Sequence, residues 1–305
     1  MSYELKSDEK LSDGLRRIVR KQIDKALENL RPTVRSRDVA VHEARVCIKK
    51  IRAILLLSKH SLGNDIFDLE DTAYRDAARA LAKARDSAAM LEILDQLIEH
   101  FSETLARDVF TTVKATLKRS QKLKQPAQSH AMTKAAKALR QARQRIDDWP
   151  RIEHQQTLRD LKLVFKRGRT SFAKAYEQPS VENFHEWRKQ VKHLLYLARV
   201  LGSLWSQMMA VLAAELKALA KLLSEDHDLA LLREEVSQQL EETENRAEIE
   251  GLLALIDQRR NELQVTARFL GKRIYAEKPG AFVDRIATYW QAWNSETKVD
   301  PIVAG

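Results

Sequence analysis

Apolar residues recur every three to four positions along almost the whole chain, which is the period of an amphipathic helix. This spacing predicts helices over residues 11–30, 39–61, 66–85, 87–124, 131–147, 152–177, 181–203, 205–224, 226–245, 247–276 and 281–294. Proline or glycine stands at most of the intervals between them, and Ser180 is placed to cap the helix that follows it. No segment shows a clear two-residue alternation of the kind found in β-strands. We therefore expect an all-α fold built from helical bundles.

One pattern occurs twice, 143 residues apart. His42-Glu43-Ala44-Arg45 aligns with His185-Glu186-Trp187-Arg188, and Lys49 then falls on Lys192. The same offset, with a one-residue gap in its later part, gives further pairs: Arg16 with Arg159, Arg75 with Lys217, Arg79 with Lys221, and Arg85-Asp86 with His227-Asp228. The simplest interpretation is a pair of pseudo-symmetric antiparallel bundles, over residues 1–125 and 126–305.

A basic stripe lies beside the apolar face of the first repeated helix. At about 100° per residue, His42, Arg45, Lys49 and Arg52 fall within roughly 80° of each other. The second copy repeats the arrangement with His185, Arg188 and Lys192. Aspartate and glutamate are absent between Ala44 and Gly63, so ion pairs within that helix cannot explain the stripe. We expect both stripes to face a groove, the alternative being surface cations whose stems cover the core.

The next helix of each copy carries further cations. Arg79 and Lys83 are four residues apart, as are Lys217 and Lys221, and we expect them to face the same groove rather than solvent. Asp86 and Asp228 are expected to have a structural role, either as helix caps or by holding Arg85 and His227 in place.

The net charge of +10 is concentrated locally. Residues 109–146 contain 10 Lys and Arg and no acid, whereas basic and acidic residues balance at 43 each elsewhere. Local basic surfaces attract polyanions such as nucleic acid, anionic membranes or phosphate polymers. The single cysteine, Cys47, excludes an intrachain disulfide and a cysteine zinc site. The chain contains no glycine-rich phosphate loop, no apolar run of membrane-spanning length and no secretory leader, so we expect a cytoplasmic protein.

The residues 41–53 and 184–196 resemble the two signatures of the CHAD domain, a family named for conserved histidines in an α-helical domain. Residues 81–86 and 223–231 resemble two further segments of that family, although Ala82 and Ser224 replace its usual glycine and Leu195 replaces a usual arginine. The resemblance implies two pseudo-symmetric helical bundles that bind inorganic polyphosphate, association with polyphosphate granules and no catalysis. The ligands it implies are His42, Arg45, Lys49, Arg52, His185, Arg188 and Lys192.

Three alternatives remain beside this interpretation. A metal site is disfavoured because the histidines stand beside cations and no paired metal motif occurs. Polyphosphate hydrolysis is disfavoured because the stripes lack carboxylates to hold Mg²⁺, although a phosphohistidine on His42 or His185 stays open. Binding of nucleic acid or of an acidic protein is the strongest rival, since the window 109–146 is so basic, but it contains one aromatic residue, Phe110, for base stacking.

The sequence therefore predicts a non-catalytic module that binds inorganic polyphosphate and needs no metal or cofactor. The complete set of candidate phosphate-binding residues is Arg16, His42, Arg45, Lys49, Lys50, Arg52, Arg79, Lys83, Arg85, Arg159, His185, Arg188, Lys192, Lys217, Lys221 and His227.

Overall fold

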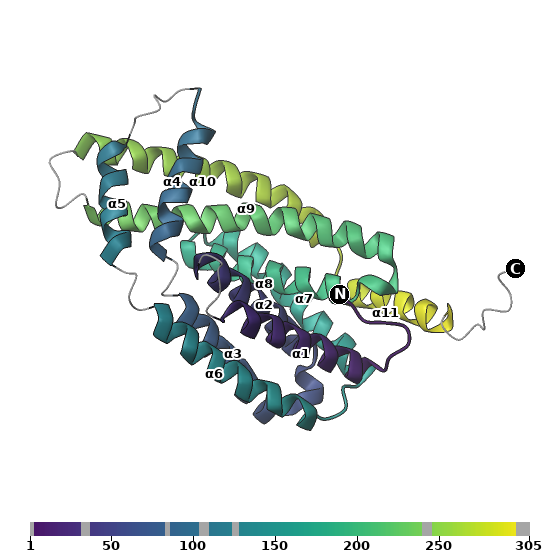
Figure 1. Cartoon of the computed structure of the whole chain (residues 1–305). Helices are drawn as coiled ribbons and strands as arrows, with labels where there is room; N and C mark the ends of the chain where they lie inside the picture. Colours follow the sequence, from purple (N-terminus) through teal and green to yellow (C-terminus); the bar gives the residue numbers. More distant parts are fainter. Residues whose placement is uncertain are drawn as a thin grey trace, which may run out of the picture.

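The computed structural model describes residues 3–31, 37–82, 86–103, 110–123, 128–239 and 246–296. These residues form α-helices joined by short connections, and no strand occurs among them, so the expected all-α class is confirmed (Figure 1). The helices are α1 (Leu11–Asn29), α2 (Arg37–Leu57), α3 (Lys59–Ala82), α4 (Asp86–His100), α5 (Thr111–Leu123), α6 (Gln128–Arg145), α7 (His154–Glu177), α8 (Val181–Val200), α9 (Ser206–Gln239), α10 (Arg246–Ile274) and α11 (Pro279–Glu296). The short 3₁₀ turns η2 (Ile146–Asp148) and η3 (Gly202–Leu204) follow α6 and α8.

Two predicted helix boundaries are wrong. The helix expected over 87–124 is divided into α4 and α5, and Phe110, just before α5, has a positive φ of 65°. The two helices expected over 205–224 and 226–245 form one helix, α9, because no proline or glycine interrupts it. The role of Asp228 as a helix cap is therefore excluded, since it lies inside α9.

Two hydrophobic cores hold the helices together. The main core contains residues of α1, α2, α3, α6, α7, α8 and α11, together with the first half of α9 and the last turns of α10. The distal core contains residues of α4, α5, the second half of α9 and the first part of α10. The long helices α9 and α10 lie side by side and pass through both cores (Figure 1). Each core thus combines helices from both sides of residue 125.

The order of helix contacts in the first part of the chain recurs in the second. Helix α1 packs on α2 as α7 packs on α8, and α2 packs on α3 as α8 packs on α9. Helix α3 also packs on α6 and α4 on α5, and α9 packs on α10. Helices α2 and α8 contact each other directly, which brings together the two helices that carry the repeated stripe.

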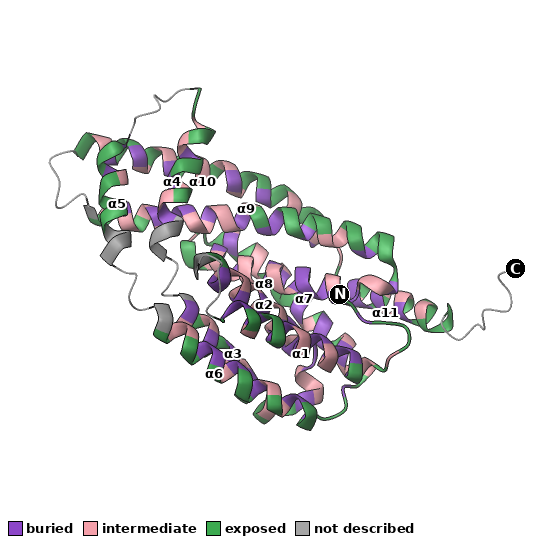
Figure 2. Ribbon diagram, viewed as in Figure 1, coloured by how far each residue is buried: buried purple, intermediate pink, exposed green. Residues whose placement is uncertain are grey.

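Burial follows the predicted apolar faces. Val41, Ala44, Ile48 and Ile51 of α2 are at most 1% exposed, and the interior sides of the main-core helices are buried (Figure 2). Trp187 is fully buried and Trp290 nearly so. Trp205 is 47% exposed, and its ring contacts Tyr289 of α11 edge to face.

Candidate functional site

The start of α8 orients the second stripe. Ser180 caps this helix, because its hydroxyl accepts a hydrogen bond from the backbone N–H of Asn183 at 3.2 Å. One turn further, Trp187 fills the core and is surrounded by other aromatic rings. His185 and Arg188 stand on either side of Trp187 in the sequence and are half-buried at the edge of the core. This is the shoulder position that the helical periodicity predicts.

Four cations from two helices meet around Lys192. Arg45 and Lys49 of α2 and Arg188 of α8 all act on its ammonium group. Burial, followed by the repulsion from these cations, lowers the pKa of Lys192 to about 6. Asp228 of α9 acts in the opposite direction and partly stabilises the charged form. The structure thus brings part of each predicted stripe together in one place.

A histidine pair adjoins these cations. Nδ1 of His185 lies 3.3 Å from Nδ1 of His227 on α9, and the two ring centroids are 4.4 Å apart. Burial, followed by the charge of Arg188, lowers the pKa of His227 to about 3, and the same two causes lower the pKa of His185. Both rings are therefore neutral at pH 7. We call Arg45, Lys49, His185, Arg188, Lys192 and His227 the cationic cluster.

Ser224 of α9 is a site residue that the sequence analysis did not identify. Its hydroxyl accepts a hydrogen bond from Nε of Arg188 at 3.2 Å, which fixes the guanidinium beside the histidine pair. Ser224 could have been identified from its position three residues before His227, because this spacing places both side chains on the same side of a helix.

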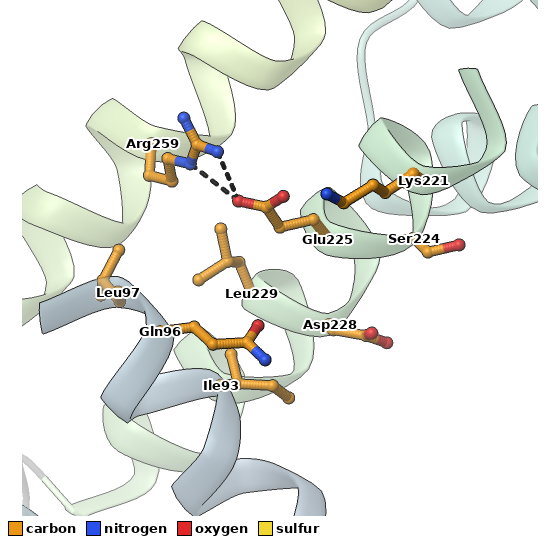
Figure 3. Close-up of a pocket in the computed structure, with 9 residues that line it drawn as sticks. All are labelled: Ile93, Gln96, Leu97, Lys221, Ser224, Glu225, Asp228, Leu229 and Arg259. Atoms are coloured by element: carbon orange, nitrogen blue, oxygen red, sulfur yellow. Dashed lines mark hydrogen bonds and ion pairs between the residues drawn. The ribbon is translucent and has the colours of Figure 1, made fainter. Parts of the chain in front are cut away.

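A pocket adjoins the cluster between α4, α9 and α10 (Figure 3). Its α9 wall contains Lys221, Ser224 and Asp228, so Ser224 belongs to both the pocket and the cluster. At the far side, Glu225 accepts two hydrogen bonds from Arg259, at 2.6 and 2.8 Å. The remaining walls are Ile93, Gln96, Leu97 and Leu229. Lys221, an expected phosphate ligand, lines this pocket, and its amine points toward Glu225 (Figure 3).

Arg52, at the other end of the first stripe, is neutralised from a neighbouring helix. Its Nε lies 2.8 Å from Oδ1 of Asp71 on α3, and Arg75 lies 3.8 Å from the second oxygen of this carboxylate. The absence of acids between Ala44 and Gly63 could not reveal this pair. Arg52 remains close to α8, because its charge, after burial, contributes to lowering the pKa of His193 to about 4.

Two candidates are located away from the cluster. Lys50 lies over the ring of Tyr3, 5.0 Å from its centroid, and the cations that act on it are Lys25 and Arg199. Arg16 donates hydrogen bonds to the backbone carbonyls of Trp149 and Pro150, which attach α1 to the segment after η2. Both belong to the packing around α1, and the repeat offset does not carry Arg16 into the site.

The other candidates are peripheral or not described. Arg79 is exposed and forms an ion pair with Asp76 at 3.2 Å. Lys217 of α9 and Arg159 of α7 are exposed. His42 is half-buried on α2, one turn before Arg45. Lys83 and Arg85 lie outside the described residues, as does the side chain of Asp86, the first residue of α4.

The described basic residues of the window 109–146 belong to two different helices. They are divided between α5, in the distal core, and α6, in the main core. Three of them form ion pairs with acids of other helices: Lys114 with Asp95 at 2.7 Å, Arg143 with Asp24 at 2.6 Å and Arg145 with Glu70 at 2.6 Å.

The described part of the chain contains no group of three or more His, Cys, Asp or Glu side chains arranged to hold a metal ion. Within the same residues, no helix combines the length and the hydropathy that a bilayer-spanning segment requires.

Comparison with curated proteins gave no match. Comparison with protein families gave a match to the CHAD domain over residues 17–237. This range runs from α1 to the second half of α9 and includes both stripes, Ser224 and the histidine pair. The expected resemblance is thereby confirmed, and the chain belongs to the CHAD domain family.

Proposed function

We propose that the chain binds inorganic polyphosphate at the cationic cluster and catalyses no reaction there. The observation that carries this proposal is the convergence of Arg45, Lys49, Arg188 and Lys192 from two helices onto one half-buried place. Burial, followed by repulsion from the neighbouring cations, lowers the pKa of Lys192, and a bound polyanion would offset the repulsion. Arginine offers a planar fork for phosphate oxygens, and lysine offers a compact charge.

The shape and composition of the cluster favour a phosphate chain over nucleic acid. Single-stranded nucleic acid is held mainly by exposed aromatic rings that stack on bases. Phe184, Trp187 and Tyr196, the aromatic residues of the segment that carries the second stripe, are at most 7% exposed and belong to the core. A ligand without bases does not depend on stacking, so buried aromatic rings do not weaken its binding at such a site.

The acids near the cluster argue against hydrolysis. Glu186 accepts hydrogen bonds from Lys189 and Gln190, both at 2.5 Å. Asp228 faces Lys192, a cation that competes with a metal for the carboxylate. Since polyphosphate hydrolysis normally uses carboxylates to hold Mg²⁺ beside the phosphates, binding alone is the better-supported activity. In a cell that stores polyphosphate, this binding would place the protein on polyphosphate granules.

An internal duplication would explain how the cluster arose. We propose that α1, α2, α3–α4 and α5–α6 correspond to α7, α8, α9 and α10, with a pseudo-two-fold axis between α2 and α8. The recurring order of helix contacts supports this proposal. Under such symmetry, the basic stripe of each copy faces the same groove.

A titration with polyphosphate of defined length tests the function. We expect long chains to bind far more tightly than pyrophosphate, and the affinity to fall steeply with added salt. Replacing Arg45, Lys49, Arg188 and Lys192 together by glutamine should weaken binding about 1000-fold, at roughly 1 kcal/mol for each lost cation.

A matched variant controls for net charge. Lys10, Lys162, Lys166 and Lys174 are exposed lysines outside the cluster, and their replacement by glutamine removes the same number of basic side chains and at least as much positive charge. We expect this control to bind within a few-fold of the parent. Equal losses in both variants would reject the site, and displacement of polyphosphate by DNA at equal phosphate concentration would favour nucleic acid as the ligand.

A further inference from the structure

Lys192, His185 and His227 of the cationic cluster can each exist in a neutral form at neutral pH. They lie beside arginines of the same cluster, which stay charged at that pH. We propose that polyphosphate binding at this cluster is coupled to proton uptake by Lys192 and by the His185–His227 pair, so that the protein holds its ligand more tightly as the pH falls. This inference rests on the proposed function and concerns the regulation of the same site.

The geometry of the histidine pair supports uptake of one proton. At an Nδ1···Nδ1 distance of 3.3 Å, one ring donates a hydrogen bond and the other accepts it, so only one hydrogen fits between them. A proton added to the outer nitrogen of the donor ring turns this bond into a stronger, charge-assisted one. A second proton would set two N–H groups against each other, which opposes full protonation of the pair.

The charged groups around the pair keep it neutral until an anion arrives. Arg188, Lys192 and Lys189 on α8 and Lys49 on α2 disfavour the charged form, and Glu186 favours it. A phosphate chain laid on these cations would reverse the sign of the local potential and favour protonation.

Lys192 is subject to the same balance. Arg188 on α8 and Arg45 and Lys49 on α2 face it as cations, and Asp228 on α9 is the acid that opposes them. Together with burial, they keep its pKa near 6 in the unliganded protein, so most molecules carry a neutral amine at pH 7. Bound phosphates restore the ordinary preference of an amine for its charged form, and Lys192 then takes up close to one proton.

The sign of the pH dependence follows from linkage. If binding takes up one proton, the association constant falls about tenfold for each unit by which the pH rises. Lys192 supplies this slope from about pH 6 upward, since below its own pKa it is already charged before the ligand binds. Below about pH 6, the remaining pH dependence of the association constant comes from proton uptake by the histidine pair.

Calorimetric titration with long-chain polyphosphate at pH 7, in Pipes and in Tris, measures the coupling. These buffers differ in heat of ionisation, so the difference in binding heat counts the protons taken up, and long chains contribute few titrating end groups. We expect close to one proton for each occupied site. Lys192→Arg, which is charged at every pH used, should bind with little uptake, whereas the matched control Lys217→Arg on the exposed side of α9 should keep the full uptake.

Repeating the titration near pH 5, in two buffers that ionise in that range and differ in heat of ionisation, isolates the histidine pair. We expect uptake to persist there in the parent and to disappear in His227→Asn. Polyphosphate binding with equal heats in both buffers at pH 7 would overturn the inference and leave the proposed function intact. Absence of binding would instead reject the proposed function. Because the parent protein alone decides between these outcomes, a variant that fails to fold does not affect the conclusion.

Discussion

Replacing Lys192 by methionine should stabilise the fold while weakening the site. In the folded protein the pKa of Lys192 is about 6, compared with an ordinary value of 10.5, and burial is the largest cause. Between these two values the unfolded chain binds more protons than the folded one, so this lysine reduces stability at low pH and the loss fades as the pH rises toward 10.5. At pH 7 the span of 3.5 pH units corresponds to at most about 5 kcal/mol, at roughly 1.4 kcal/mol per unit.

The expected gain for Lys192→Met is about 2–5 kcal/mol in the free energy of unfolding at pH 7, because water entry and side-chain movement reduce the full penalty. Methionine keeps most of the stem and removes the amine. Urea unfolding followed by circular dichroism measures this gain, which should shrink below about 1 kcal/mol at pH 10, where the penalty in the parent has nearly gone. Lys217→Met, at an exposed position of the same residue type, should change stability by less than about 0.5 kcal/mol. A Lys192→Met protein that is no more stable than the parent, or a gain that does not vary with pH, would refute the reasoning.

Three further changes test other parts of the structure. Asp71→Asn removes the carboxylate 2.8 Å from Arg52 and should tighten polyphosphate binding about 2- to 5-fold at low salt, as read by titration; an unchanged affinity would place Arg52 outside the ligand path. Arg145→Met leaves the carboxylate of Glu70, whose side chain is 1% exposed, without its ion-pair partner and should cost about 3–5 kcal/mol in urea unfolding, much of it recovered when Glu70→Gln is added. Gly168→Ala would put a Cβ 2.6 Å from the hydroxyl of the buried Tyr275 and should lower stability by about 1–3 kcal/mol, whereas Gly251→Ala, with open space around it, should be neutral or mildly stabilising.

Most of the fold was predictable because nearly every helix buries a regular apolar face. The errors occur where that local signal is absent. The helix break before α5 occurs at Phe110, which has a positive φ. Phenylalanine rarely adopts this conformation, so its presence in the sequence does not indicate a break. The continuity of α9 was missed because its partners change along its length, from α8 in the main core to α4 in the distal core, and the apolar pattern shifts with them.

The site was predictable only as far as it depends on periodicity along single helices. Spacing within α2 and α8 places Arg45, Lys49, Arg188 and Lys192 on the shoulders of their helices. The pairing of Arg52 with Asp71 depends on how α2 and α3 pack, which no spacing within α2 encodes. The same holds for Arg16, whose partners are two backbone carbonyls more than 130 residues away in the chain.

The passage of α9 and α10 through both cores has a practical consequence for dissecting this protein. A fragment ending near residue 125 would contain α3 without α6 and α4 without α9, and so would expose one side of each core. The complementary fragment would retain Arg188 and Lys192 but lose the partner cations on α2. A polypeptide that keeps the whole cationic cluster must therefore contain both α2 and α8 with the helices that pack on them, and fusion tags are best attached outside α1 and α11.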